Sequence, residues 1–262
     1  MNLWTIVTVF GCLFASFAYY QALRIGTMAL VDVVWTSVLT LGGISFAAFM
    51  QVNGEATLRT WMVFVVFLAW SFRLTLYLMR HRVLNSAEDP RYAYLAQYWG
   101  STAKRNFYFL FLAQVPLAVL FLWPVVHAAN NPSSLATTDI LALLIALGSL
   151  LGESIADHQL AEFRQKPANS GKVCDSGLWR YSRHPNYFFE WLHWWAYVAF
   201  ALGGPKAWVS LLGPLLMYIF LRYITGIPHA ERSSLRSRGE AYRNYQQRTS
   251  PFFPWIPRLP PS

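Results

Sequence analysis

The stretch MALVDVVWTSVLTLGGISFAAFM, residues 28–50, decides the fold class. Its 23 residues contain a single charged side chain, Asp32. A helix of about 20 apolar residues spans a hydrocarbon core of roughly 30 Å. We therefore predict that residues 28–50 form a transmembrane helix.

The whole chain has the composition of a membrane protein. Of the 262 residues, 55% are apolar and only 13% are charged, whereas soluble domains carry roughly 25% charged residues. This balance argues against a soluble enzyme and against intrinsic disorder, which requires low hydrophobicity. We expect one all-α membrane domain over residues 1–262 with seven spans: Leu3–Leu23, Met28–Met50, Leu58–Met79, Phe107–Ala128, Ile140–Ala156, Tyr187–Leu202 and Ala207–Thr225.

The basic residues predict the orientation of these spans. Of the 21 Lys and Arg, 17 fall on one set of alternating ends, and only Arg59 and Lys206 fall on the other. By the positive-inside rule, the amino terminus lies outside and the carboxyl terminus is cytosolic. The net charge of +9 then reflects topology and contact with membrane lipid, and we expect no nucleic-acid partner. Because no basic residue precedes Arg24, we expect the first segment to be a span and not a cleaved leader.

Polar residues recur inside the predicted spans at helical spacing. Asn186, Glu190, His193 and Tyr197 follow one another at steps of four, three and four residues, which places them on one helical face. Glu153, Asp157 and Arg164 also share a face if their helix continues through DHQLAEFRQK and stops before Pro167. In the third segment Arg73 and Tyr77 are in line with Arg80 and His81.

Such residues have two interpretations. They could be interhelical pairs that hold the bundle together, or they could line a site. We favour a site, because the polar stripes converge on the membrane face where two basic loops meet. Arg and Lys with Trp179, Tyr181 and Tyr187 interleaved suit a phosphorylated, aromatic ligand. A dinucleotide fits best, and S-adenosylmethionine fits less well. A GxGxxG motif after a strand is absent from the sequence, so a Rossmann half is not expected.

One stretch resembles a known family. GLWRYSRHPNYFFEW, Gly177–Trp191, is similar to the signature of membrane-embedded steroid 5-alpha reductases, sterol reductases and their bacterial relatives. Its RHPNY core also resembles the RHPxY of isoprenylcysteine carboxyl methyltransferases and phospholipid methyltransferases. Three features favour the reductases: Asp157 with Arg164 and Lys166 upstream, Glu190 after Asn186, and the tail EAYRNYQQRTSPFFPWIP. SFRLTLYLMRHR at residues 71–82 and EDPRY at residues 88–92 are similar to the bacterial branch.

The resemblance implies a seven-helix enzyme that binds NADPH from the cytosol and reduces a carbon–carbon double bond conjugated to a ketone. Its model substrates are 3-oxo-delta-4 steroids, so the substrate is expected to be a lipophilic small molecule. The surplus of basic residues favours NADPH over NADH, because a 2′-phosphate needs such partners. The residues expected at the cofactor are Arg73, His81, Arg82, Asp157, Arg164, Lys166, Trp179, Tyr181, Arg183, His184, Asn186, Glu190 and Glu231.

The acid that would polarise the substrate carbonyl is less well matched. The family uses a glutamine and glutamate pair on the second helix with a tyrosine on the third, whereas the second segment here offers only Asp32. We predict that Asp32, kept protonated by burial, donates to the carbonyl with Tyr77 as a helper. The alternative is that Asp32 pairs with Arg73.

Two other functions remain open. The runner-up is an S-adenosylmethionine-dependent methyltransferase of a lipid or prenylated cysteine, against which Asn186 and Glu190 argue. A transporter or structural membrane protein would explain the helices without the signature. The histidines lack the spacing of a metal site, so we predict no metal and no obligate protein partner. The expected location is the inner membrane in a bacterium or the endoplasmic reticulum in a eukaryote.

Overall fold

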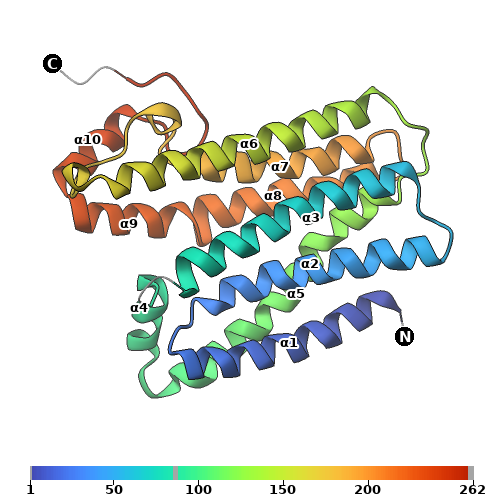
Figure 1. Cartoon of the computed structure of the whole chain (residues 1–262), viewed down its shortest axis with the longest axis horizontal. Coiled ribbons are helices and arrows are strands. Elements are labelled where there is room, and N and C mark those ends of the chain that lie inside the picture. Colours follow the sequence, from blue (N-terminus) through green and yellow to red (C-terminus); the bar gives the residue numbers. More distant parts are fainter. Residues whose placement is uncertain (1, 85–87, 259–262) are drawn as a thin grey trace. The chain divides into compact units, whose positions relative to one another are not determined.

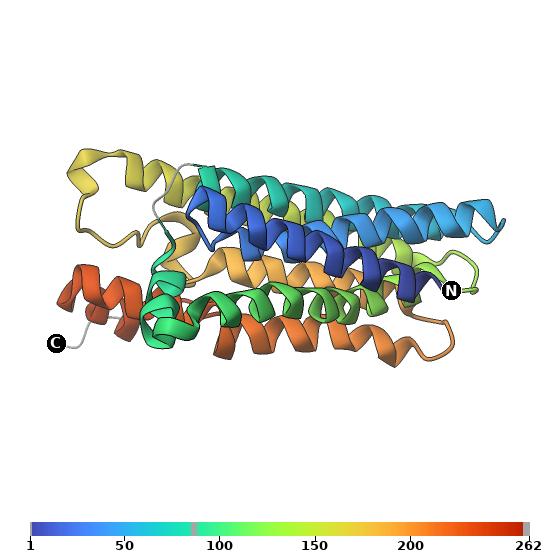
Figure 2. The same cartoon turned by 90° about the horizontal axis from the view of Figure 1, so that it is seen from below.

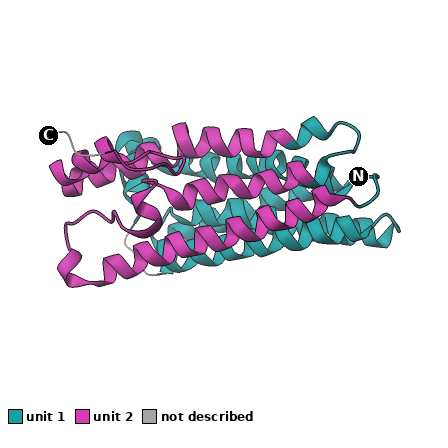
Figure 3. Ribbon diagram, turned by 90° about the horizontal axis from the view of Figure 1, so that it is seen from above, with its two compact units in different colours: residues 1–135, 200–210 teal, residues 136–199, 211–262 magenta. Residues whose placement is uncertain are grey.

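The computed structural model describes residues 2–84 and 88–258, and the chain is all-helical over these ranges (Figure 1). It divides into two compact units, which Figure 3 colours separately. The first unit comprises residues 1–135 and 200–210, and the second comprises residues 136–199 and 211–262.

Helix α2 is the centre of the first unit. It packs against α1, α3 and α5 (Figures 1 and 2). Its residues are buried on more than one side, as expected of an apolar helix surrounded by others. The elements of this unit are α1 (Leu3–Ile25), α2 (Leu30–Val52), α3 (Leu58–Leu78), a π-helical turn η1 (Met79–Leu84), α4 (Pro90–Trp99), the short turn η2 (Gly100–Thr102) and α5 (Ala103–Ala129).

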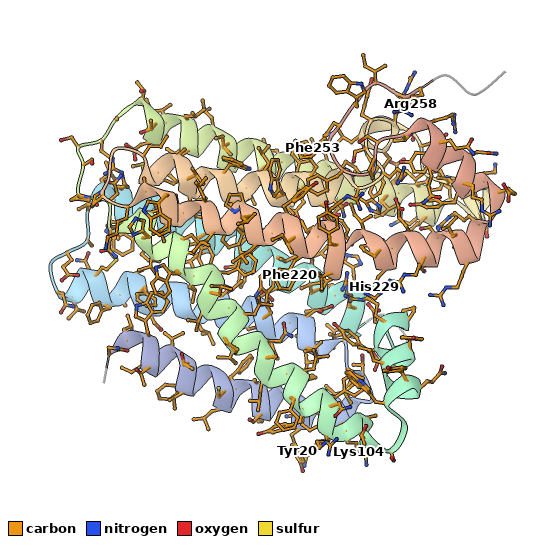
Figure 4. The ribbon with its side chains drawn as sticks, turned by 180° about the vertical axis from the view of Figure 1, so that it is seen from behind. Tyr20, Lys104, Phe220, His229, Phe253 and Arg258 are labelled. Atoms are coloured by element: carbon orange, nitrogen blue, oxygen red, sulfur yellow. The ribbon has the colours of Figure 1, made fainter. Side chains whose placement is uncertain are left out.

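Small residues and local contacts bring these helices close together. A Cβ atom at Gly43 of α2 would lie 2.9 Å from the ring of Phe67 on α3, so glycine permits this close approach. Near the carboxyl-terminal end of α1, the Tyr19 hydroxyl donates to the carbonyl of Lys104 at the start of α5, at 2.7 Å. Figure 4 shows the neighbouring Tyr20 and Lys104 at this end.

The second unit carries the signature loop between two helices. Its elements are α6 (Thr137–Gln165), η3 (Pro167–Asn169), η4 (Gly177–Arg180), α7 (Pro185–Ala201), α8 (Leu212–Ile219), the π-helical turn η6 (Phe220–Ile224), α9 (Ile227–Arg238) and α10 (Glu240–Arg248). The turn η5 (Ala207–Leu211), most of which belongs to the first unit, precedes α8. Helix α6 continues to Gln165, so the predicted extension that stops before Pro167 is confirmed.

Aromatic side chains join α7, α8 and the tail of the second unit. The Trp191 indole N–H of α7 donates to the carbonyl of Pro214 at 3.0 Å. The rings of Trp191 and Tyr218 lie 5.9 and 5.3 Å from that of Phe252, which is buried in the tail. These contacts fix the carboxyl-terminal segment against the helices that carry the polar residues.

The chain is a multi-pass membrane protein. In the described ranges six stretches of helix are long and apolar enough to cross a membrane. They are Leu3–Ile25, Leu30–Val52, Leu58–Leu84, Pro90–Ala129, Thr137–Gln165 and Ala207–Arg238. Helix α7, which corresponds to the predicted span Tyr187–Leu202, has 17 residues and is not among the six.

Candidate functional site

A row of polar side chains runs between α6 and α7, and we call it the α6–α7 seam. The Asn186 side-chain amide donates to the Asp157 carboxylate at 3.1 Å. Further along, Ser149 Oγ lies 3.3 Å from His193 Nδ1. The other ring nitrogen of His193 lies 2.7 Å from the hydroxyl of Tyr197.

Two buried acids complete the seam. Glu153 and Glu190 are 5% and 6% exposed and belong to the polar stripes of α6 and α7. A carboxylate is costly to bury in a membrane helix unless it faces polar groups or a ligand. We therefore treat the seam as the candidate functional site of the second unit.

The signature loop is held against α6 by side-chain bonds. The Trp179 indole N–H donates to the carbonyl of Ala156 at 2.9 Å. The Gln159 side chain accepts from the backbone N–H of Leu178 at 2.9 Å. Gly177 begins this turn with φ of +59°, a left-handed conformation that favours glycine. These contacts place the loop beside the carboxyl-terminal part of α6, near the end of the seam where Asp157 and Asn186 meet.

Arg183 and His184 of the loop share one acid, Glu231 of α9. Arg183 Nε lies 2.7 Å from Glu231 Oε1, and His184 Nε2 lies 3.4 Å from the same oxygen. Burial lowers the pKa of His184, although Glu231 opposes this effect. His184 also stacks on Tyr187, with ring centroids 5.3 Å apart. The predicted residues Arg183, His184 and Glu231 therefore form one cluster, in which Arg183 and Glu231 are ion-paired.

The carboxyl-terminal tail runs along the signature loop. The Arg183 backbone N–H donates to the carbonyl of Ser250 at 2.8 Å, and the Trp255 N–H donates to the carbonyl of Tyr181 at 2.9 Å. The Ser182 hydroxyl donates to the carbonyl of Phe252 at 2.8 Å. Figure 4 labels Phe253 and Arg258 on this tail. The tail is thus a structural part of the loop cluster.

The remaining predicted residues of the second unit are exposed. Arg164 and Lys166 lie in and just after the last turn of α6. The Lys166 ammonium lies 2.8 Å from Glu162 at the i,i+4 spacing. Tyr181 is 44% exposed. These three side chains are accessible to a ligand that reaches this end of the second unit, and the seam itself does not include them.

Asp32 of the first unit sits in a network of ion pairs. Its Oδ2 lies 2.6 Å from Arg82 and 2.7 Å from Arg91. The hydroxyl of Tyr92 donates to Oδ1 at 2.6 Å. Asp89 also pairs with Arg91 at 2.9 Å.

These contacts correct the prediction for Asp32. Both carboxylate oxygens accept hydrogen bonds, and two guanidinium groups stabilise the negative charge, so a protonated Asp32 is disfavoured. We therefore do not retain Asp32 as the proton donor. The pairing partners are Arg82 and Arg91, whereas Arg73 was the partner considered from the sequence. Arg82, predicted at the cofactor, holds this carboxylate in the structure.

The other predicted residues of the first unit lie along α3 and the turn that follows it. Arg73 and Tyr77 are half-buried on α3, and His81 is exposed in η1. The rings of Tyr77 and His81 lie 4.6 Å apart. The in-line arrangement expected from their spacing thus brings Tyr77 and His81 together. A π-helical turn in a membrane helix is often found at a functional site.

The chain matches one family model. The family described as "Protein of unknown function (DUF1295)" matches residues 18–249. The chain belongs to this family. No curated protein matches it. Because the matched stretch contains the seam, the signature loop and the Asp32 network, these features lie in the part of the chain that the DUF1295 match covers.

Some residues of the site were missed from the sequence. Ser149 lies one turn before Glu153, so the i,i+4 spacing could have added it to the stripe. Arg91 and Tyr92 lie inside the EDPRY stretch, whose role only the folded chain defines. Gln159 has no sequence signal, because its bond to Leu178 depends on how the loop folds back.

Proposed function

We propose that this protein is an NADPH-dependent reductase of a lipophilic enone. The observation that carries the proposal is the bond between Asp157 and Asn186, with the buried Glu190 one turn further along α7. These are the residues on which the resemblance to steroid 5-alpha reductases rests. Their meeting between two helices supports a shared ligand-binding role.

The groups of the second unit fit the chemistry of this cofactor. Asp157, Asn186 and Glu190 offer the carboxylates and the amide that bind hydroxyl and carboxamide groups. Arg164 and Lys166, exposed at the same end of α6, suit phosphates. Tyr181 is exposed and offers an aromatic face, whereas Trp179 is buried against α6. NADPH, when bound, supplies the hydride.

The protein has to orient the substrate and stabilise the enolate that forms. Hydride adds to the beta carbon of the enone, and the electron pair of the double bond moves toward the carbonyl oxygen as an enolate. A hydrogen-bond donor at that oxygen stabilises the developing charge. Tyr77 of the first unit stays the prediction from the sequence for this donor. The final proton on the alpha carbon comes from solvent.

We propose that α7 is the seventh span, with the amino terminus outside and the signature loop and tail in the cytosol. The support is the distribution of Lys and Arg, 17 of which lie on one set of ends. In this topology the end of the seam that contains Asp157 and Asn186 lies toward the cytosol, where NADPH is available. The membrane is the inner membrane of a bacterium or the endoplasmic reticulum of a eukaryote.

The test is substrate turnover by the purified full chain in lipid. We expect NADPH oxidation that depends on a 3-oxo-delta-4 steroid, with the saturated 3-oxo steroid as product. Asn186→Ala should abolish it, whereas Asn244→Ala on the exposed face of α10 should leave it unchanged. Tyr77→Phe should lower kcat by about 10²–10³-fold, the effect of losing one donor to the developing oxyanion. Methyl transfer from S-adenosylmethionine without NADPH oxidation would overturn the proposal.

A further inference from the structure

The second unit has a groove with a volume of about 530 Å³ on the surface of α6. One wall is α6, with Gly148, Leu151 and Ile155 among its lining residues, and Phe189 of α7 contributes from the other side. The loop closes one end with Arg180 and Tyr181. Every lining residue belongs to the second unit.

The end of this groove near Gly148 is apolar and open. Leu151 and Ile155 are 54% and 49% exposed, although they lie in a helix that is apolar enough to cross a membrane. A Cβ atom at Gly148 would meet no atom within 4 Å, so the space above the helix is free. This surface faces hydrocarbon in a bilayer and suits an alkyl chain.

The other end of the groove is polar and basic. Gln159 lies there with Arg180, whose side chain is exposed. From Gly148 to Gln159 the helix rises about 16 Å at 1.5 Å per residue. This length is close to one leaflet, half of a hydrocarbon core of roughly 30 Å. The groove is therefore long enough to hold the acyl chain of a lipid in one leaflet.

The tail supplies residues typical of the membrane–water interface. Trp255 and Ile256, 74% and 77% exposed, line a second hollow with Tyr181. The backbone bond from Trp255 to Tyr181 fixes the tail at the polar mouth of the groove. Tryptophan and tyrosine are enriched at membrane–water interfaces. The two hollows share Tyr181. The apolar groove, the Arg180 cation and the aromatic rings of Tyr181 and Trp255 therefore form one continuous surface.

We propose that this groove binds an anionic phospholipid. One acyl chain lies along α6 over Gly148, Leu151 and Ile155. The phosphate binds the guanidinium of Arg180, and Tyr181 and Trp255 flank the headgroup. The lipid site shares Tyr181 with the proposed cofactor site, but its acyl-chain surface on α6 lies outside the α6–α7 seam.

Native mass spectrometry of the full-length protein tests the proposal with two lipids of identical acyl chains. We expect phosphatidylglycerol to bind more tightly than phosphatidylcholine. Arg180→Gln should weaken phosphatidylglycerol binding about fivefold, the effect of one basic residue near an anionic headgroup. It should weaken phosphatidylcholine binding less, because the choline cation of that headgroup offsets the negative charge of its phosphate. Arg243→Gln, which removes an exposed cation of α10, is the matched control and should change neither.

Filling the groove tests the acyl-chain part. Gly148→Leu should reduce binding of both lipids, whereas Leu147→Phe, at an exposed α6 position outside the lining, should not. Thermal unfolding checks that each variant is folded. If Gly148→Leu fails to fold, Arg180→Gln alone tests whether the protein recognises the anionic headgroup. Equal binding of the two lipids by the wild type would overturn the proposal. Unchanged lipid binding in both Arg180→Gln and Gly148→Leu would also overturn it. A third contrary result would be that Gly148→Leu weakens binding of a steroid enone but of neither lipid.

Discussion

The ionisable residues of the loop cluster differ in the charge that they hold. Arg183 is paired with Glu231 and also donates to the carbonyls of Gln246 and Thr249 at 2.9 and 2.7 Å. His184 faces the same acid from a buried position. Arg183 is charged, whereas burial favours a neutral His184. Their responses to mutation and to pH should therefore differ.

We predict that His184 makes the protein less stable as the pH falls. Its pKa lies below that of an exposed histidine because of burial, while Glu231 opposes and Arg183 and Arg222 reinforce the shift. The unfolded chain then takes up the proton first, so stability is full above about pH 6.5 and declines below it. Thermal unfolding between neutral and acidic pH measures this.

The matched controls separate His184 from the other titrating groups. His184→Gln should flatten the decline in unfolding temperature below neutral pH. His158→Gln, at an exposed position on α6, should leave the pH profile as in the wild type. A His184→Gln profile as steep as that of the wild type would show that another group controls the acid response.

The ion pair of Arg183 and Glu231 gives a second prediction. Removing Glu231 leaves Arg183, which is 9% exposed, without its counter-ion, and removing Arg183 does the same to Glu231, which is 17% exposed. Arg183→Met or Glu231→Leu alone should lower the free energy of unfolding by about 3–5 kcal/mol. The double variant should be more stable than the sum of the two losses implies, with a coupling of about 1–3 kcal/mol in chemical denaturation. Additive losses would contradict a direct pair.

At the scale of elements, the turn η4 depends on the glycine at its first position. Gly177 has φ of +59°, and a Cβ there would lie 2.6 Å from the Gln159 side chain. Gly177→Ala should therefore destabilise the protein by about 1–2 kcal/mol. Gly148→Ala, in a helix with open space around it, should instead stabilise it by about 0.5–1 kcal/mol. Changes of the same sign in the two variants would contradict this account of the turn.

The sequence predicts the long helices well and the short ones poorly. The predicted spans Leu3–Leu23 and Leu58–Met79 differ from α1 and α3 by two residues or fewer at each end. Hydropathy marks the part of a helix that meets hydrocarbon, so it identifies these elements. The predicted span Ala207–Thr225 is broken into η5, α8 and η6, because periodicity does not distinguish α from π turns. The charged helices α9 and α10 also carry no apolar run to reveal them.

The same limit applies to the candidate site. The steps between Asn186, Glu190, His193 and Tyr197 predict one face, and two of these residues bond to α6. The environment of Asp32 could not be predicted, since Arg82 and Arg91 follow it by about fifty residues or more and reach it only in the folded chain. Spacing along one helix is local information, whereas the charge state of a buried acid depends on distant partners.

At the scale of the whole molecule, the number of spans determines which side each end lies on. Seven spans place the two termini on opposite sides of the membrane, and six place them on the same side. We predict that a reporter fused after residue 258 is cytosolic and that one fused before α1 is external. Reporters active only in one compartment measure this. Finding both termini on the same side would contradict the proposed orientation.

The central claim is that the seam of the second unit binds NADPH. The most direct test is calorimetric titration of the purified full chain with NADPH, NADH and S-adenosylmethionine, in the wild type and in Asn186→Ala and Asn244→Ala. We predict that NADPH binds the wild type and Asn244→Ala alike, that NADH binds more weakly, and that Asn186→Ala binds neither. Binding of S-adenosylmethionine alone, or NADPH binding that survives Asn186→Ala in a folded protein, would contradict the claim.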